Sequence, residues 1–166
     1  MNDIIHHTTL KVRDIEASAR WYETVLGMVR YYDNEIVLSG NGLAAGQAGD
    51  RTHLIIMQAE DPVIGMIGLL QWIEPELAAP PEIPRTVTYG NPTFVVASDD
   101  VREAHRRAMA LGTHVHAEPH DWSVEGADGM LKTFLGLSLF DPDGYFYELN
   151  QLLHSKPMNA PEQRSA

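Results

Sequence analysis

The chain has 166 residues, which suits one well-packed domain or two small fused halves, and is too short for two ordinary independent domains. Its formal net charge is −11, with 12 Lys and Arg against 23 Asp and Glu. No nucleic-acid partner is therefore expected, because phosphate binding requires a basic surface. The chain contains no cysteine, which excludes disulfides, thiolate metal ligands and a cysteine nucleophile, and is compatible with a reducing compartment.

The N-terminal region has neither the positive start nor the apolar run of a signal peptide, and no apolar stretch reaches membrane-spanning length. We therefore expect a cytoplasmic protein with no membrane partner. With 44% hydrophobic and 21% charged residues, the composition is that of a globular chain.

The first half reads as strand, helix and three strands. A strand is predicted over Ile4–Val12, and Asp14 then caps a helix over Ile15–Leu26 that ends at Gly27. Three apolar runs after the helix read as strands, separated by a loop rich in glycine and alanine over 40–50. The runs are Met28–Ser39, His53–Gln58 and Ile67–Ile73.

The second half repeats this order after a segment, Glu74–Pro92, that holds five prolines and no periodicity. A strand is predicted over Thr93–Ala97, and a helix opens at Asp100 and closes at Gly112. A loop rich in histidine and acidic residues precedes two closing strands, Leu131–Phe140 and Tyr145–Asn150. We therefore predict one βαβββ module over 1–74, a linker over 75–92, a second module over 93–151 and a flexible tail over 152–166.

The last predicted strand carries an acidic residue among large apolar ones. Residues 141–144 read Asp-Pro-Asp-Gly, which is turn chemistry, so the strand should begin at Tyr145. Alternation then puts Glu148 on one face with Phe146 and Asn150, and Tyr147 on the other. An ionised carboxylate there is costly unless a cation, a metal or hydrogen-bond donors compensate it, and the alternative is a solvated acid on an edge strand.

Counting along the two halves suggests which positions are equivalent. His7 lies seven positions before Asp14, and Thr93 lies seven before Asp100. The run Gly68–Ile73 placed over Tyr145–Asn150 makes Gln71 the counterpart of Glu148. Because a duplicated unit brings equivalent strands around one cavity, we expect His7, Gln71, Thr93 and Glu148 to converge.

Three segments, His7–Asp14, Ala17–Gly27 and Asp141–Leu149, resemble the vicinal oxygen chelate superfamily. This group includes glyoxalase I, extradiol dioxygenases, methylmalonyl-CoA epimerase and the fosfomycin and bleomycin resistance proteins. The resemblance implies an α+β fold in which two tandem βαβββ modules form a curled mixed sheet around a central cleft. It also implies a divalent metal (Zn, Fe, Mn, Ni or Mg), a small-molecule substrate and a homodimer.

In this resemblance His7, Gln71 and Glu148 fall on metal-ligand positions, whereas Thr93 stands where metal-dependent members usually have histidine. Glu148 and His7 are then the candidate catalytic residues, because a carboxylate on such a metal can leave it to carry a proton. The alternative is a metal-free cleft in which His7 and Glu148 hydrogen-bond each other or a ligand.

The implied function is that of a glyoxalase-like metal-dependent lyase, isomerase or epimerase, acting on a small oxygenated substrate through an enolate-like state. Two alternatives stay open. One is an extradiol-type ring-cleavage dioxygenase, which usually needs two histidines and a carboxylate on iron. The other is a metal-free small-molecule-binding protein of the bleomycin-resistance kind. The predicted histidine loop, with His114, His116 and His120, either closes over the cleft to supply an acid–base group or is merely exposed.

Overall fold

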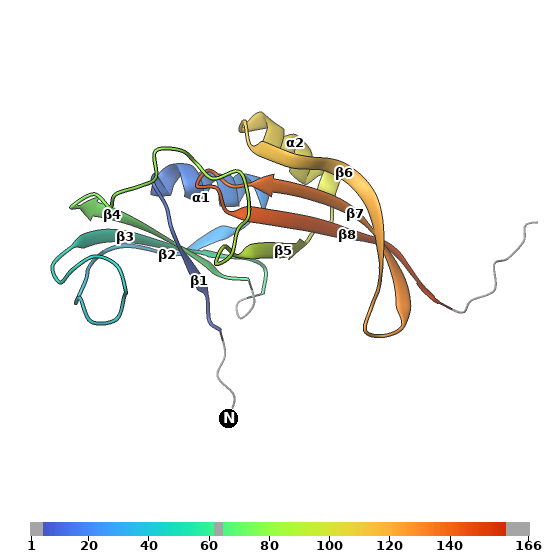
Figure 1. Cartoon of the computed structure of the whole chain (residues 1–166), viewed down its shortest axis with the longest axis horizontal. Helices are drawn as coiled ribbons and strands as arrows, with labels where there is room; N and C mark the ends of the chain where they lie inside the picture. The colour runs from blue at the N-terminus through green and yellow to red at the C-terminus, as the bar shows by residue number, and fades with distance from the viewer. Residues whose placement is uncertain (1–4, 62–64, 159–166) are drawn as a thin grey trace, which may run out of the picture. The chain divides into compact units, whose positions relative to one another are not determined.

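The structure is a computed structural model that describes residues 5–61 and 65–158. Each half of the chain follows the order βαβββ, which confirms the predicted fold class of two tandem βαβββ modules (Figure 1). The first module contains β1 (Thr8–Lys11), α1 (Ile15–Val25), β2 (Val29–Val37), β3 (Arg51–Gln58) and β4 (Ile67–Glu74). The second contains β5 (Thr93–Ala97), α2 (Val101–Ala110), β6 (His114–Glu125), β7 (Met130–Phe140) and β8 (Phe146–Pro157).

The strands form two mixed four-stranded sheets, one for each module, in the orders β1-β4-β3-β2 and β5-β8-β7-β6. In each sheet the first strand of the module is parallel to the last, and the other pairs are antiparallel. The chain divides into two compact units, residues 1–85 with 142–144 and residues 86–141 with 145–166. The boundary at 85 therefore falls inside the proline-rich segment predicted as the linker.

Both helices begin where the sequence predicts, because an aspartate caps each of them. Asp14 Oδ1 accepts hydrogen bonds from the N–H groups of Glu16 and Ala17, and Asp100 Oδ1 accepts one from Glu103. Within each unit the helix packs on its own sheet, and the buried residues Tyr22 of α1 and Val101 of α2 contribute to the two cores. No helix among the described residues is long and apolar enough to cross a bilayer.

Three predicted boundaries differ from the structure. The segment predicted as a histidine-rich loop is β6, a strand of 12 residues. β8 continues to Pro157, past the predicted start of the tail at Leu152, and the tail from 159 onward lies outside the described residues. β1 is shorter than the predicted strand, whose first residue, Ile4, also lies outside them.

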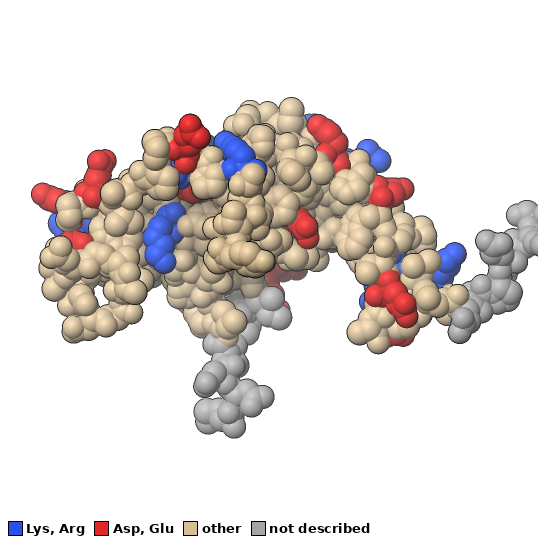
Figure 2. All heavy atoms as spheres, viewed as in Figure 1, with Lys and Arg blue, Asp and Glu red and all other residues tan. Residues whose placement is uncertain are grey.

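An ion-pair network ties α1 to the adjacent strand of the first unit. The guanidinium of Arg30 contacts Glu16 at 2.8 Å, Glu23 at 2.9 Å and Asp33 at 3.0 Å, and His53 Nε2 lies 2.6 Å from Asp33 Oδ1. The hydrogen bond from Arg30 lowers the pKa of Glu16, and that from His53 lowers the pKa of Asp33. On the face shown in Figure 2, acidic and basic side chains are interspersed.

Because the pKa values of Glu16 and Asp33 are lowered by folding, their contribution to stability is present above the unfolded pKa values of about 4 and is lost as the pH falls through the folded values. Arg30→Met should cost about 1 kcal/mol near neutral pH, a figure kept small because the pairs are partly exposed. It should also flatten the loss of stability below pH ~4. Urea unfolding at several pH values measures both effects, with Arg102→Met, on the exposed surface of α2, as the control. Equal acid slopes in Arg30→Met and the wild type would contradict the network.

Candidate functional site

Glu148 is displayed by β8 on the face of the second sheet opposite to its buried residues. The turn before β8 is closed from both sides, since Tyr145 N–H donates to Asp141 Oδ1 at 2.8 Å and Asp141 N–H donates to the Tyr145 carbonyl at 2.9 Å. Along the strand, Tyr147 and Leu149 are each 1% exposed, whereas Glu148 between them is exposed. The predicted alternation is confirmed, and the carboxylate is solvated instead of buried.

Two irregularities in β6 bring histidines to the same sheet face as Glu148. The register with β7 shifts between Val115 and Ala117 and again between Ala117 and His120, so that β6 holds an extra residue at each place. Such bulges re-aim side chains, and Pro119 within the second one is a residue that strands tolerate at edges and bulges. As a result, His116 and His120 both face the pocket that Glu148 lines.

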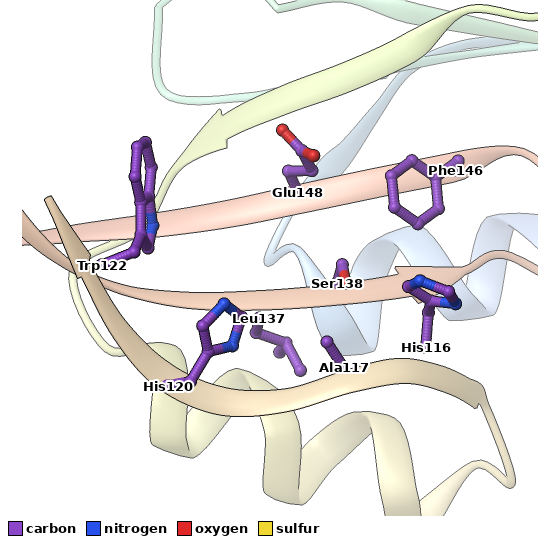
Figure 3. Close-up of a pocket in the computed structure, with 8 residues that line it drawn as sticks. All are labelled: His116, Ala117, His120, Trp122, Leu137, Ser138, Phe146 and Glu148. Carbon is purple, nitrogen blue, oxygen red and sulfur yellow. The ribbon is translucent and has the colours of Figure 1, made fainter. Parts of the chain in front are cut away.

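The pocket has a volume of about 420 Å³ and is lined by eight residues of the second unit. Figure 3 shows Trp122 at one end of it and Phe146 at the other, with Glu148 on β8 and the histidines on the edge strand β6. The lining residues come from three neighbouring strands of one sheet. They are His116, Ala117, His120, Trp122, Leu137, Ser138, Phe146 and Glu148.

The hydrogen bonds of the pocket fix one histidine tautomer and leave the carboxylate available. His120 Nδ1 lies 2.8 Å from the carbonyl oxygen of Glu118, and because a carbonyl only accepts, the proton must be on Nδ1. In the neutral ring Nε2 is then an acceptor. Glu148 makes no hydrogen bond or ion pair with any residue that the structure describes, so a bound molecule can use both of its oxygens.

Trp122 forms a fixed aromatic wall. Its indole stacks on Phe134, with ring centroids 5.0 Å apart and an interplanar angle of 22°, and its Nε1–H donates to Asn150 Oδ1 at 3.0 Å. Gly136 on β7 makes room for the ring, since a Cβ there would lie 2.8 Å from Trp122 Nε1. Nothing in the sequence alone showed that Trp122 shares a sheet face with Glu148, because the bulges set its register.

The other predicted site residues are placed as follows. Thr93 is exposed and pairs with Phe146 at the start of β5. His7 precedes β1 in the first unit, where its Nδ1 lies 3.1 Å from His6 Nδ1. Its ring borders Gly68, since a Cβ on that glycine would lie 3.3 Å from His7 Cδ2. His114 faces the ring of Phe140 at 5.7 Å and is not among the residues that line the pocket.

Gln71 belongs to the framework of the first unit. Its Oε1 accepts the N–H of Ile15 at 3.0 Å, and Gln151 does the same for Val101 at 3.1 Å in the second unit. The strand registers likewise make Gly68, and not Gln71, the counterpart of Glu148. The predicted equivalence of Gln71 and Glu148 is therefore wrong by three residues along β4.

Gln71 does not fit a metal site that includes His7. Gln71 is three residues from Gly68 along β4, so it projects from the opposite sheet face to the one that His7 borders. Its amide oxygen is also occupied by α1. Within the described ranges, no group of three or more His, Asp or Glu side chains is arranged to hold a metal ion.

The tandem βαβββ modules, each with a mixed sheet, define a protein of the glyoxalase fold. The chain belongs to the Glyoxalase/Bleomycin resistance protein/Dioxygenase superfamily, whose family model matches residues 4–149. The resemblance inferred from the sequence is therefore confirmed.

Several solved structures share this fold at low sequence identity. A glyoxalase family protein from Bacillus cereus is 14% identical, with 91% of this chain and 95% of that chain covered and a TM-score of 0.71. The trypanothione-dependent glyoxalase I of Leishmania major is 16% identical, with coverages of 90% and 87% and a TM-score of 0.59. A point mutant of the fosfomycin resistance protein FosX of Listeria monocytogenes, complexed with Mn(II) and 1S,2S-dihydroxypropylphosphonic acid, is 16% identical, with coverages of 91% and 93% and a TM-score of 0.50. No curated protein matches the chain in sequence.

Proposed function

We propose that the second-sheet pocket binds a small oxygenated molecule and that Glu148 moves a proton at a carbon next to a carbonyl group, as in a glyoxalase-like lyase, isomerase or epimerase. The supporting observation is the Glu148 carboxylate, which has no hydrogen-bond or ion-pair partner among the described residues and shares the pocket with two imidazoles. Glu148 takes the proton from carbon, the electron pair of the C–H bond enters the enolate, and the same proton or one from water is returned.

Other pocket side chains have the chemistry to assist this step. Neutral His120 presents Nε2 as an acceptor, so it is a second group that can carry a proton. His116 packs its ring edge-on against Phe146, with centroids 5.7 Å apart, and it or the Ser138 hydroxyl can donate a hydrogen bond to the enolate oxygen.

Metal dependence stays a prediction, and the proton transfer by Glu148 is described without a metal. The structure of FosX holds Mn(II), whereas among the described residues of this chain no three His, Asp or Glu side chains are grouped to hold a metal ion. Elemental analysis of the purified protein and of His7→Ala tests whether a divalent ion binds. Near-stoichiometric iron would favour the ring-cleavage alternative. The homodimer and the cytoplasmic location also stay predictions.

A second candidate function, metal-free binding without turnover, is favoured by the fixed wall of Trp122 and Phe134. Such a rigid aromatic surface holds a flat ligand without any chemistry. The two functions differ in whether a bound carbonyl compound exchanges its hydrogen with solvent.

The test follows hydrogen exchange in D₂O by NMR. The protein is incubated with hydroxyacetone, 2-hydroxycyclohexanone and 2-hydroxyacetophenone, and loss of the signal of the hydrogen next to the carbonyl is recorded. Exchange that rises in proportion to the protein concentration, above the buffer rate, supports proton transfer. Binding by calorimetry with no exchange above buffer would overturn the enzyme proposal in favour of the binding protein.

A further inference from the structure

The polar lining of the pocket is short of hydrogen-bond donors. Glu148 only accepts, and neutral His120 offers only Nε2, because its Nδ1–H is used by the Glu118 carbonyl. The Trp122 Nε1–H is used by Asn150, and the other polar groups, His116 and the Ser138 hydroxyl, can donate or accept. None of the eight lining residues is Lys or Arg. With neutral histidines the lining therefore carries one formal negative charge and no fixed cation.

This lining treats anionic and donor-bearing ligands differently. A carboxylate or phosphate placed against Glu148 would bring two like charges together in a partly enclosed site, which is unfavourable. Hydroxyl or amino hydrogens can instead pair with Glu148 and with His120 Nε2, and a hydrogen bond to a charged group is among the stronger ones.

The aromatic lining adds a requirement on shape. Trp122 is held by its stack on Phe134 and by its bond to Asn150, yet the residue remains 37% exposed. A ring that is already fixed loses little side-chain freedom on binding, so it favours a flat partner. Figure 3 shows the indole standing at the same end of the pocket as His120.

We infer that this pocket selects an uncharged or cationic ring that carries hydroxyl or amino groups, and that it rejects ligands whose contacting group is a carboxylate or phosphate. The inference rests on the proposed function only in taking this pocket as the ligand site. The inference narrows the proposed substrate to a small oxygenated molecule whose group in contact with Glu148 is not anionic.

The test is calorimetric titration of the full chain at pH 7.5 with four compounds that share one ring. Quinoline has no hydrogen-bond donor. 3-Aminoquinoline and quinoline-3-methanol each add one donor group, and quinoline-3-carboxylate adds an anionic group. The two donor compounds should bind about 10-fold to 100-fold tighter than quinoline, the range of one hydrogen bond to a charged group. The carboxylate should bind weaker than quinoline. A carboxylate that binds as tightly as the donor compounds would overturn the inference.

Substitutions of pocket residues test whether the ligand selectivity arises in this pocket. Glu148→Gln replaces one acceptor oxygen with a donor, so binding of 3-aminoquinoline should weaken about tenfold and binding of quinoline-3-carboxylate should tighten. Trp122→Ala should weaken the whole series by a similar factor, because every member offers the same ring. Glu125→Gln, at the exposed end of β6, is the matched control and should bind like the wild type. Unchanged affinities for both 3-aminoquinoline and quinoline-3-carboxylate in Glu148→Gln would assign the selectivity to another site.

Failure of this inference can be told apart from failure of the proposed function. Donor selectivity that depends on Glu148, with no hydrogen exchange in D₂O, leaves the inference standing and removes the enzyme. Exchange that depends on Glu148, together with tight binding of the carboxylate, removes the inference and keeps the enzyme.

Discussion

Replacing Asp143 with alanine should lower the free energy of unfolding by about 3 kcal/mol, the cost of leaving the partners of a buried charge unpaired. The side chain of Asp143 is 3% exposed in the first unit. Its Oδ1 accepts the backbone N–H of Arg13 at 2.8 Å, and its Oδ2 accepts the Ser18 hydroxyl at 2.7 Å. The Arg13 guanidinium adds an ion pair at 3.3 Å. Alanine removes every acceptor of this side chain at once.

Two companion variants separate the charge from the hydrogen bonds. Asp143→Asn keeps one oxygen acceptor and nearly the same volume, so it should cost clearly less than Asp143→Ala. Ser18→Ala removes one donor and should cost about 1 kcal/mol. Urea unfolding followed by circular dichroism measures all three. If Asp143→Ala lowered the free energy of unfolding by less than about 1 kcal/mol, solvent would be replacing the lost acceptor. The contacts of Asp143 with Arg13 and Ser18 would then contribute little to the stability of the first unit.

Local signals in the sequence were sufficient where a few neighbouring residues determine the structure. Asp14 and Asp100 mark the two helix starts because an aspartate side chain caps the N–H groups that follow it. The face of Glu148 was predictable because the period of two along β8 places it between two buried residues.

The composition of the pocket was not predictable, because it depends on how β6 pairs with β7. The alternation His114, His116, Glu118, His120 hints at a strand, but Pro119 and the abundance of polar residues favour a loop. Two bulges then decide which side chains share a face, and bulges leave little trace in a single sequence. His116, His120 and Trp122 could therefore not be assigned to the face of Glu148.

The equivalence of Gln71 and Glu148 failed for a related reason. The two helix starts can be aligned from the sequence. The stretches between the helix and the last strand differ in length between the modules, so counting residues from the helices does not align the last strands correctly. The structure shows that Gln71 corresponds to Gln151, because each side chain accepts the first N–H of the helix in its own module. An acceptor used in this way belongs to the fold and not to a metal site.

Glu148→Gln should reduce the rate of hydrogen exchange from a bound hydroxy ketone by about 10² to 10⁴-fold, the usual contribution of a positioned acid–base group. An amide has almost the shape of a carboxylate but cannot take a proton from carbon. Because Glu148 is exposed and makes no bond to any described residue, the substitution should leave the free energy of unfolding within about 0.5 kcal/mol of the wild type.

That combination of a large kinetic effect with little effect on stability distinguishes a catalytic carboxylate from a structural one. The exchange rate is measured by NMR in D₂O at several substrate concentrations, so that a loss of the maximal rate is separated from a loss of binding. Glu125→Gln, on an exposed part of the same sheet, should exchange at the wild-type rate. If Glu148→Gln retains more than about a tenth of the wild-type rate, proton transfer must be assigned to another group, and His120, which lines the same pocket, becomes the next residue to replace.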